Sequence, residues 1–308
     1  MTTTKTPTTV RTRATPRAKP LIDFRALMLN SLQDRWQSFR AELKRCRKKY
    51  SEEAVHDLRV ATRRLIATLD LVDRIHPEAN LRKARRALKR QLDMFGPLRD
   101  VQVQLLTIDK MLSSFPELQE FYNFLAKRER KSTQRLGVEL KRVKTDKIRK
   151  SIAGAARQLE ALPDTPAVQQ EKRAEALLAI EMAFNRVIER KLTIAPTDSS
   201  SIHRMRVAFK KFRYMVESLA PQRGRTTSKQ LKAMNAFQGS MGDIQDAEVL
   251  LTTMQAFAHT RGIEGEAPLT RAVAELSRRR TALIETFLGS ADSLFTFWKP
   301  MSKVNGVR

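Results

Sequence analysis

Apolar residues recur every three or four positions along most of the chain after residue 20, the spacing typical of amphipathic α-helices. Gly and Pro are scarce, whereas Leu, Ala, Lys and Arg are plentiful, and this balance favours helices over strands. The sequence therefore predicts an all-α protein. We expect helices near residues 22–48, 52–75, 78–112, 116–136, 140–161, 171–193, 199–220, 227–259 and 268–296.

Two segments interrupt the helical pattern and suggest how the chain is divided. The first 20 residues are rich in Thr, Pro, Arg and Lys and contain no acid, which is typical of a disordered basic tail. The stretch LPDTPAVQQ contains two prolines and an Asp and is the best candidate for a boundary. The expected organisation is a tail over 1–20, a helical half over 21–161, a linker over 162–170 and a second helical half over 171–308.

The two halves share a first motif. VHDLRVATRRLIATLDLV at 55–72 resembles IHRMRVAFKKFRYMVESL at 202–219, so that His56 corresponds to His203. In this alignment Arg59 matches Arg206, Arg63 matches Lys210 and Arg64 matches Lys211.

A second motif follows in the same order. MFGPLRDVQVQLL at 94–106 resembles SMGDIQDAEVLLT at 240–252, which pairs Asp100 with Asp246. The matched order and nearly equal spacing predict two copies of one helical unit. Gly96-Pro97 should kink or break its helix, and Gly239 and Gly242 lie at a similar depth in the later helix.

The net charge of the chain gives the first indication of its function. Lys and Arg number 59 against 33 Asp and Glu, a formal net charge of +26. Such a surplus repels itself, so we expect a negative partner: nucleic acid, an anionic membrane or a phosphate polymer. No apolar run is long enough to span a bilayer, and the single cysteine, Cys46, fits a reducing cytoplasm.

The basic residues of the repeated motif lie on one helix face. At about 100° per residue, Arg59 and Arg63 fall close to His56 and opposite the apolar seam. The second copy behaves alike, with one face that contains His203, Arg206, Lys210 and Tyr214.

The segment LRKARRALKRQL at 81–92 carries a broader basic arc. No acid interrupts the arc, so its charges have no partner one turn away. Basic faces from several helices can converge on one groove that holds phosphates; the alternative is a solvated basic surface. The arc contains Arg82, Lys83, Arg85, Arg86, Lys89 and Arg90, and a sparser stripe in the second half contains Arg225, Lys229 and Lys232.

The His and Asp residues of the motifs do not form a recognisable catalytic or metal site. His56 and His203 either donate hydrogen bonds to phosphate, with affinity rising as pH falls, or orient a neighbouring side chain. Asp100 and Asp246 are expected to orient Arg or Lys or to cap a helix. The sequence predicts no metal, no cofactor and no catalytic residue. Apart from Tyr214, aromatic residues are not interleaved with the basic ones, which argues against base stacking.

VHDLRVATRRL with GPLRDVQVQLL, repeated as IHRMRVAFKKFRY with GDIQDAEVLL, resembles the CHAD domain, the conserved histidine α-helical domain, over roughly 22–296. The resemblance implies two pseudo-symmetric antiparallel four-helix bundles that form a basic groove or central pore. It also implies binding of long-chain inorganic polyphosphate and association with polyphosphate granules. Two positions depart from the pattern: Ile66 stands where the second copy has Arg213, and Gln245 replaces the Arg expected before Asp246. The ligands carried over by motif are His56, Arg59, Arg63, Arg64, His203, Arg206, Lys210, Lys211 and Arg213.

The sequence thus supports a non-enzymatic polyphosphate-binding protein of the cytoplasm, located at polyphosphate granules. The alternative is a basic helical protein that binds nucleic acid. If polyphosphate is the ligand, we expect nucleic acid to compete as a weaker polyanion. A phosphohydrolase or phosphotransferase is less favoured, because no Walker A loop or nucleophile–base pair is visible and the ExExK signature of triphosphate-tunnel enzymes is absent. Tyr214, Arg82, Arg86, Lys89, Arg90, Lys229 and Lys232 join the carried-over ligands as candidate polyphosphate-binding residues.

Overall fold

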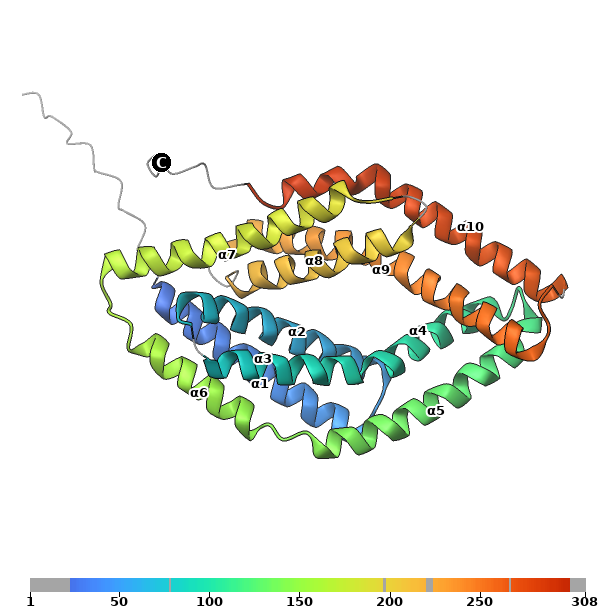
Figure 1. Cartoon of the computed structure of the whole chain (residues 1–308), viewed down its shortest axis with the longest axis horizontal. Helices are drawn as coiled ribbons and strands as arrows, with labels where there is room; N and C mark the ends of the chain where they lie inside the picture. The colour runs from blue at the N-terminus through green and yellow to red at the C-terminus, as the bar shows by residue number, and fades with distance from the viewer. Residues whose placement is uncertain (1–22, 78, 196–197, 220–223, 266, 300–308) are drawn as a thin grey trace, which may run out of the picture.

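The computed structural model describes residues 23–77, 79–195, 198–219, 224–265 and 267–299, and the expected tail over 1–20 lies outside them. The described residues form helices and no sheet; an isolated bridge joins Ala195 and Asp198. The all-α fold is confirmed (Figure 1). The helices are α1 (Phe24–Lys48), α2 (Glu52–Ile75), α3 (Ala79–Met94), α4 (Gly96–Met111), η1 (Pro116–Leu118), α5 (Gln119–Arg142), α6 (Asp146–Glu160), α7 (Pro166–Leu192), α8 (Ser199–Ser218), α9 (Gly224–Arg261), α10 (Ala267–Ser290) and η3 (Ala291–Thr296).

Side-chain caps set the starts of the two helices that carry the first motif. Ser51 precedes α2 and accepts a hydrogen bond from the amide of Ala54 at 3.3 Å, while two glutamates occupy the first turn. Asp198 precedes α8 and accepts from the amide of Ser200 at 2.9 Å. Such oxygens satisfy amides that lack a partner within the helix, and acids favour the positive end of its dipole. The caps therefore mark where each of the two helices begins.

The Gly96-Pro97 signal produces the expected break, whereas the matching glycines in the second half do not. Met94 ends α3 and Gly96 begins α4, with Pro97 in the first turn, where a missing amide hydrogen costs no helical bond. By contrast, α9 runs unbroken over 38 residues through Gly239 and Gly242. The position that matches Pro97 is Asp243, which retains its amide hydrogen. The proline decides the difference.

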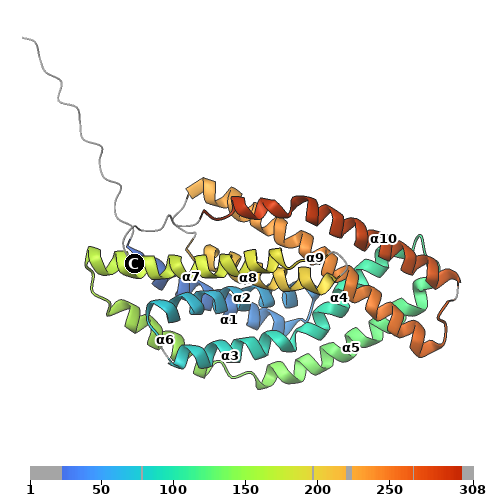
Figure 2. The ribbon, with the colours of Figure 1, turned by 45° about the horizontal axis from the view of Figure 1, so that its top comes forward.

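The apolar side chains gather into two clusters. The larger one includes Phe39, Leu65 and Phe212 and draws on α1, α2, α3, α6, α7 and α8, whereas the smaller one includes Phe121 and Phe257. The helices α4, α5, α9 and α10 contribute to both clusters and extend together toward one end of the molecule (Figures 1 and 2). Each cluster contains residues from both expected halves, so the apolar core does not divide at 162–170. The internal repeat and the boundary between halves stay predictions.

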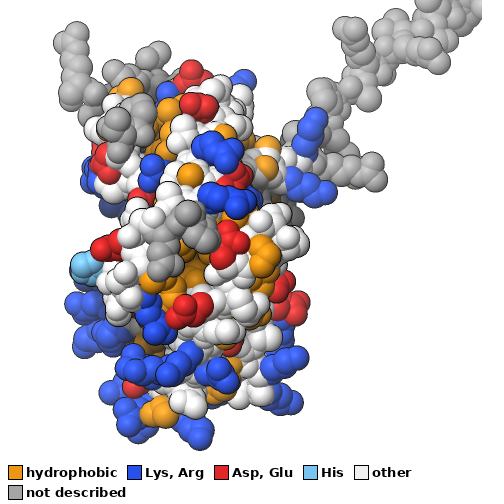
Figure 3. Space-filling view, turned by 90° about the vertical axis from the view of Figure 1, so that its right-hand side faces the viewer, with side chains coloured by type: hydrophobic (Ala, Val, Ile, Leu, Met, Phe, Trp, Pro, Cys, Tyr) orange, Lys and Arg blue, Asp and Glu red, His pale blue; other side chains and the backbone are white. Residues whose placement is uncertain are grey.

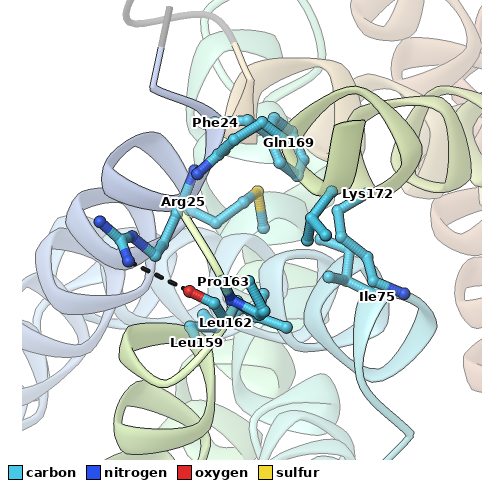
Figure 4. A pocket seen from close by; sticks show the side chains of 10 residues that line it. Phe24, Arg25, Ile75, Leu159, Leu162, Pro163, Gln169 and Lys172 are labelled. Atoms are coloured by element: carbon cyan, nitrogen blue, oxygen red, sulfur yellow. Dashed lines mark hydrogen bonds between the residues drawn. The ribbon is translucent and has the colours of Figure 1, made fainter. Parts of the chain in front are cut away.

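The expected linker over 162–170 covers most of the connection between α6 and α7. It also includes the first turn of α7, which begins at Pro166. It is anchored on the start of α1. Arg25 donates to the carbonyl of Leu162 at 3.1 Å (Figure 4). It also pairs with Asp164 at 3.1 Å, and its amide donates to Gln169. A cavity of about 10 Å³ lies beside these contacts, room for roughly one water molecule. This pocket is therefore too small to hold an extended ligand.

Candidate functional site

The two helices of the first motif pack directly against each other, and so do the two segments of the second motif on α4 and α9. This arrangement brings charged side chains that are far apart in sequence into electrostatic contact. Arg59 of α2 interacts with Asp100 of α4 and Arg206 of α8, and Arg206 interacts with Asp246 of α9. We call this group the central charged cluster; it consists of His56, Arg59, Arg63, Arg99, Asp100, His203, Arg206, Lys210 and Asp246.

The cations of the cluster are crowded and partly removed from water. Burial, reinforced by Arg63, lowers the pKa of Arg59 to about 10. Burial is also the main cause that lowers the pKa of Lys210 to about 6, followed by repulsion from Arg206, Arg63 and Arg59. Because desolvation and like charges both disfavour the charged form, the cluster holds its positive charge at a cost in free energy. An anion bound among these side chains would offset that cost.

The two acids of the second motif do not neutralise the cluster. Burial raises the pKa of both Asp100 and Asp246, although several arginines lie close enough to oppose the shift. Within the part of the chain that the structure describes, neither carboxylate forms a salt bridge within 4.0 Å. They therefore moderate the charge of the site without occupying its guanidinium groups directly. The orienting role expected for them stays a prediction.

The two motif histidines stand at the exposed edge of the cluster near the starts of α2 and α8. Burial and the nearby cations Arg63, Arg59 and Lys210 lower the pKa of His56. Burial also lowers the pKa of His203, while a hydrogen bond with Gln245 opposes the shift. Both imidazoles are thus held toward the neutral form, able to donate one hydrogen bond each. Their neighbours differ, since Asp57 opposes the shift at His56, whereas Gln245 opposes it at His203.

Gly242 lies against the guanidinium of Arg206. A Cβ added to Gly242 would lie 3.4 Å from Nη2 of Arg206 and 3.7 Å from its Nε. The Nε of Arg206 is buried and makes no hydrogen bond with the described residues. Arg59, in contrast, is held by a hydrogen bond from its Nη1 to the carbonyl of Leu92 at 3.2 Å. The two matched arginines are therefore positioned by different neighbours.

Three of the carried-over residues lie outside the cluster, in ion pairs at the α2–α8 interface. Arg64 and Arg213 both contact the buried Glu217, at 2.8 Å and 2.6 Å, and Arg213 also donates to Gln238 at 2.9 Å. Lys211 pairs with Asp70 at 3.3 Å, and Asp70 also accepts from Arg85 of α3 at 2.5 Å. These contacts give Arg64, Lys211 and Arg213 a structural role, and ligand binding by them stays a prediction.

The remaining candidates fall into two groups. Tyr214 is buried, with the guanidinium of Arg213 4.4 Å from its ring centroid, and interacts electrostatically with Arg63 and Arg206. The others are exposed on helix surfaces, and their role in binding stays a prediction. They are Arg82, Arg86, Lys89 and Arg90 on α3 and Lys229 and Lys232 on α9.

Arg99 belongs to the cluster although the sequence analysis did not select it. It is half-buried, interacts with Asp246 and Asp100, and forms an ion pair with Glu52 at the start of α2. Its place immediately before Asp100, where the second copy has Gln245, was the available signal. Arg99 thus links the first turns of α2 and α4 to the acids of the site.

A second pocket lies apart from the central charged cluster, between the start of α8 and one face of α10. It has a volume of about 290 Å³ and is lined by Asp198, Ser199, Glu248, Arg280, Thr281, Ile284, Glu285 and Leu288.

Among the described residues there is no group of three or more His, Cys, Asp or Glu that could hold a metal ion. No helix in the described ranges combines the length and apolarity needed to cross a bilayer.

Comparison with known proteins places the fold. A solved CHAD domain from the plant Ricinus communis matches 94% of this chain and 98% of its own, with a TM-score of 0.63 and 18% identity. PptA from Streptomyces chartreusis matches 88% of this chain and 99% of its own, with a TM-score of 0.54 and 15% identity. At these identities the likeness shows the fold alone, and no curated protein sequence matches significantly. The model of the CHAD domain family matches residues 30–255, most of the chain, and this protein therefore belongs to the CHAD domain family.

Proposed function

We propose that the central charged cluster binds inorganic polyphosphate. The observation that carries this proposal is the convergence of Arg59, Arg63, Arg206 and Lys210, two from each copy of the first motif, at the contact between α2 and α8. Burial and mutual repulsion destabilise their charged forms. A ligand with a negative charge on every unit offsets this repulsion at several positions at once.

The chemistry of the side chains suits phosphate. Guanidinium groups present several N–H donors in a fixed plane and bind phosphate oxygens in pairs, whereas an ammonium acts as a point charge. The neutral imidazoles of His56 and His203 add donors at the edge of the cluster. Because a polyphosphate chain has no bases or sugars between its charges, it can follow closely spaced cations. The membership of the chain in the CHAD domain family supports the same ligand.

We further propose that binding occurs without turnover and that the protein works in the cytoplasm at polyphosphate granules. The purified protein should neither hydrolyse nor extend polyphosphate, with or without divalent metal. Phosphate release that co-purifies with the protein and disappears in His56→Ala would contradict this part of the proposal. A fluorescent fusion that does not follow polyphosphate in cells would contradict the location.

A competition experiment tests the choice of ligand. Labelled polyphosphate bound to the protein is displaced by unlabelled polyphosphate, duplex DNA or RNA at equal phosphate concentration over a salt series. We expect polyphosphate to compete best at every salt concentration. Equal competition by a nucleic acid at physiological salt would mean that the cluster is a general polyanion site, since duplex phosphates also select for Lys and Arg.

A further inference from the structure

The middle of α5 connects the two apolar clusters without a buried residue of its own. Phe121 and Leu125 pack in the smaller cluster, and Leu136 and Leu140 pack in the larger one. Between Leu125 and Leu136 every side chain is exposed or only half-buried. A helical segment that adds so little to the core is free to be selected for its surface.

Exposed cations dominate this middle segment. Lys127, Arg128, Arg130, Lys131 and Arg135, which we call the α5 strap, are all exposed. The one acid among them, Glu129, is turned inward and accepts a hydrogen bond from Gln102 of α4 at 3.4 Å. No strap cation forms a salt bridge within the described ranges; the guanidinium of Arg128 lies 5.5 Å from the ring centroid of Phe124. The strap is therefore a run of like charges without intramolecular neutralisation.

The strap and the central charged cluster lie on different sides of α4. Gln102, which contacts α5, comes two residues after Asp100, which belongs to the cluster, so their side chains point about 200° apart around α4. Figure 1 shows α5 along the lower edge of the molecule. Figure 3 shows the end of the molecule that lies at the right of Figure 1. Over the lower part of that end, Lys and Arg side chains outnumber those of Asp and Glu. A phosphate chain in the cluster cannot reach the strap without passing around α4.

We propose that the α5 strap is a second polyanion-binding surface, which holds the phosphate backbone of duplex nucleic acid without reading its sequence. At 100° per residue, Arg130 lies on one flank of α5, Arg128, Lys131 and Arg135 on the other, and Lys127 between them. A duplex presents two rows of phosphates on the sides of a major groove wide enough for a helix, and the two flanks match those rows. The strap has no aromatic residue for stacking on single-stranded bases.

This inference does not depend on the ligand of the central charged cluster, and paired variants separate the two sites. The probes are a labelled 30-base-pair DNA of mixed sequence and labelled polyphosphate, each titrated with the full chain over a salt series. In Lys131→Glu with Arg135→Glu, we expect duplex affinity to fall by about tenfold or more with a flatter salt dependence. Polyphosphate affinity should stay within about twofold, because separated exposed charges are screened by salt.

The matched control is Arg173→Glu with Arg279→Glu. Both residues are exposed on other helices, α7 and α10, and the double change alters the net charge by the same amount. All variants should keep the circular dichroism and the unfolding midpoint of the parent. The proposal is overturned if the parent does not bind duplex, or if the control weakens duplex binding as much as the strap variant. It is also overturned if Arg63→Glu with Lys210→Glu removes duplex binding while the strap variant leaves it unchanged.

Discussion

Arg64 of α2 reaches Glu217 of α8 across the interface of the two motif helices, with Nε 2.8 Å from Oε2. The reverse contact is also present: Lys211 of α8 reaches Asp70 of α2 at 3.3 Å. The motif alignment relates Lys211 to Arg64, and the same offset relates Glu217 to Asp70. Each helix thus gives the other a cation and receives one, as at an interface between two copies related by a twofold axis. These contacts hold the cations of Arg64 and Lys211 outside the central charged cluster.

We expect Glu217→Ala to destabilise the protein by about 3–5 kcal/mol, because it leaves the buried guanidinium of Arg213 without its carboxylate. The measurement is equilibrium unfolding by denaturant. The matched control is Asp292→Ala, which removes the exposed partner of Lys191 and should cost less than about 1 kcal/mol. An equal loss in the free energy of unfolding for the two changes would show that the Arg213–Glu217 pair does not stabilise the fold.

Reversing two charges of the central cluster should remove ligand binding while sparing the core. Arg63→Glu with Lys210→Glu should lower polyphosphate affinity by well over about tenfold, since a hydrogen bond to a charged group is worth about 1.5–3 kcal/mol. Helicity should stay nearly intact and the salt dependence should become flatter. Arg13→Glu, outside the described residues, is the control for diffuse attraction. If it weakens binding as much as the paired change, the cluster is not the site.

Polyphosphate affinity should rise as pH falls from about 8 to about 6, because binding places negative charge beside Lys210 and raises its lowered pKa of about 6. The groups that face Lys210 are Arg59, Arg63, Arg206, Asp246 and the two motif histidines. Protonation of the histidines, whose pKa values are lowered, and of Asp100 and Asp246, whose pKa values are raised, acts in the same direction.

The conservative change Lys210→Arg separates these contributions. A guanidinium stays charged throughout this range, so the variant should bind with a flatter pH dependence between about 6 and 8 and take up fewer protons. Calorimetry in two buffers of different ionisation enthalpy measures the proton uptake. An unchanged pH profile and unchanged proton uptake would assign the dependence to other groups of the cluster.

The space beside Arg206 gives a prediction for Gly242. Gly242→Leu should displace the guanidinium and weaken polyphosphate binding several-fold, because a Cβ there already contacts Nη2 at 3.4 Å and the leucine side chain extends beyond it. Gly239→Leu is the control, since nothing lies within 4 Å of its Cβ, and both changes bring a similar gain in helix propensity of about 0.5–1 kcal/mol. Isothermal titration compares the two. Equal binding by both variants would exclude a positioning role for Gly242.

The sequence located the helices well because their ends are marked by local chemistry. Ser51 and Asp198 cap α2 and α8, and Pro97 forces a new helix to begin. The continuous α9 agrees with the helix expected over 227–259, because glycine lowers helix propensity without preventing a helix.

The site was predictable only as far as helical periodicity reaches. The wheel placed Arg63 with Arg59 and His56, and the structure brings these three together. Arg64 and Lys211 follow one position later, turned by about 100°, and meet carboxylates on the neighbouring helix. Which residue finds an acid depends on tertiary contacts, and the inclusion of Arg99 depends on its meeting Asp246 of α9. The periodicity of a single helix predicts neither the acid partners of Arg64 and Lys211 nor the inclusion of Arg99.

The unbroken course of α9 has a mechanical consequence. It passes from Phe237 in the larger apolar cluster to Phe257 in the smaller one, with Asp246 of the charged site between them. The helix has no proline near that point, and bending it there would break backbone hydrogen bonds. The two clusters are therefore joined by one continuous helix. In the proposed site, polyphosphate would meet cations on helices that are already packed together, so ordering the backbone would cost little binding free energy.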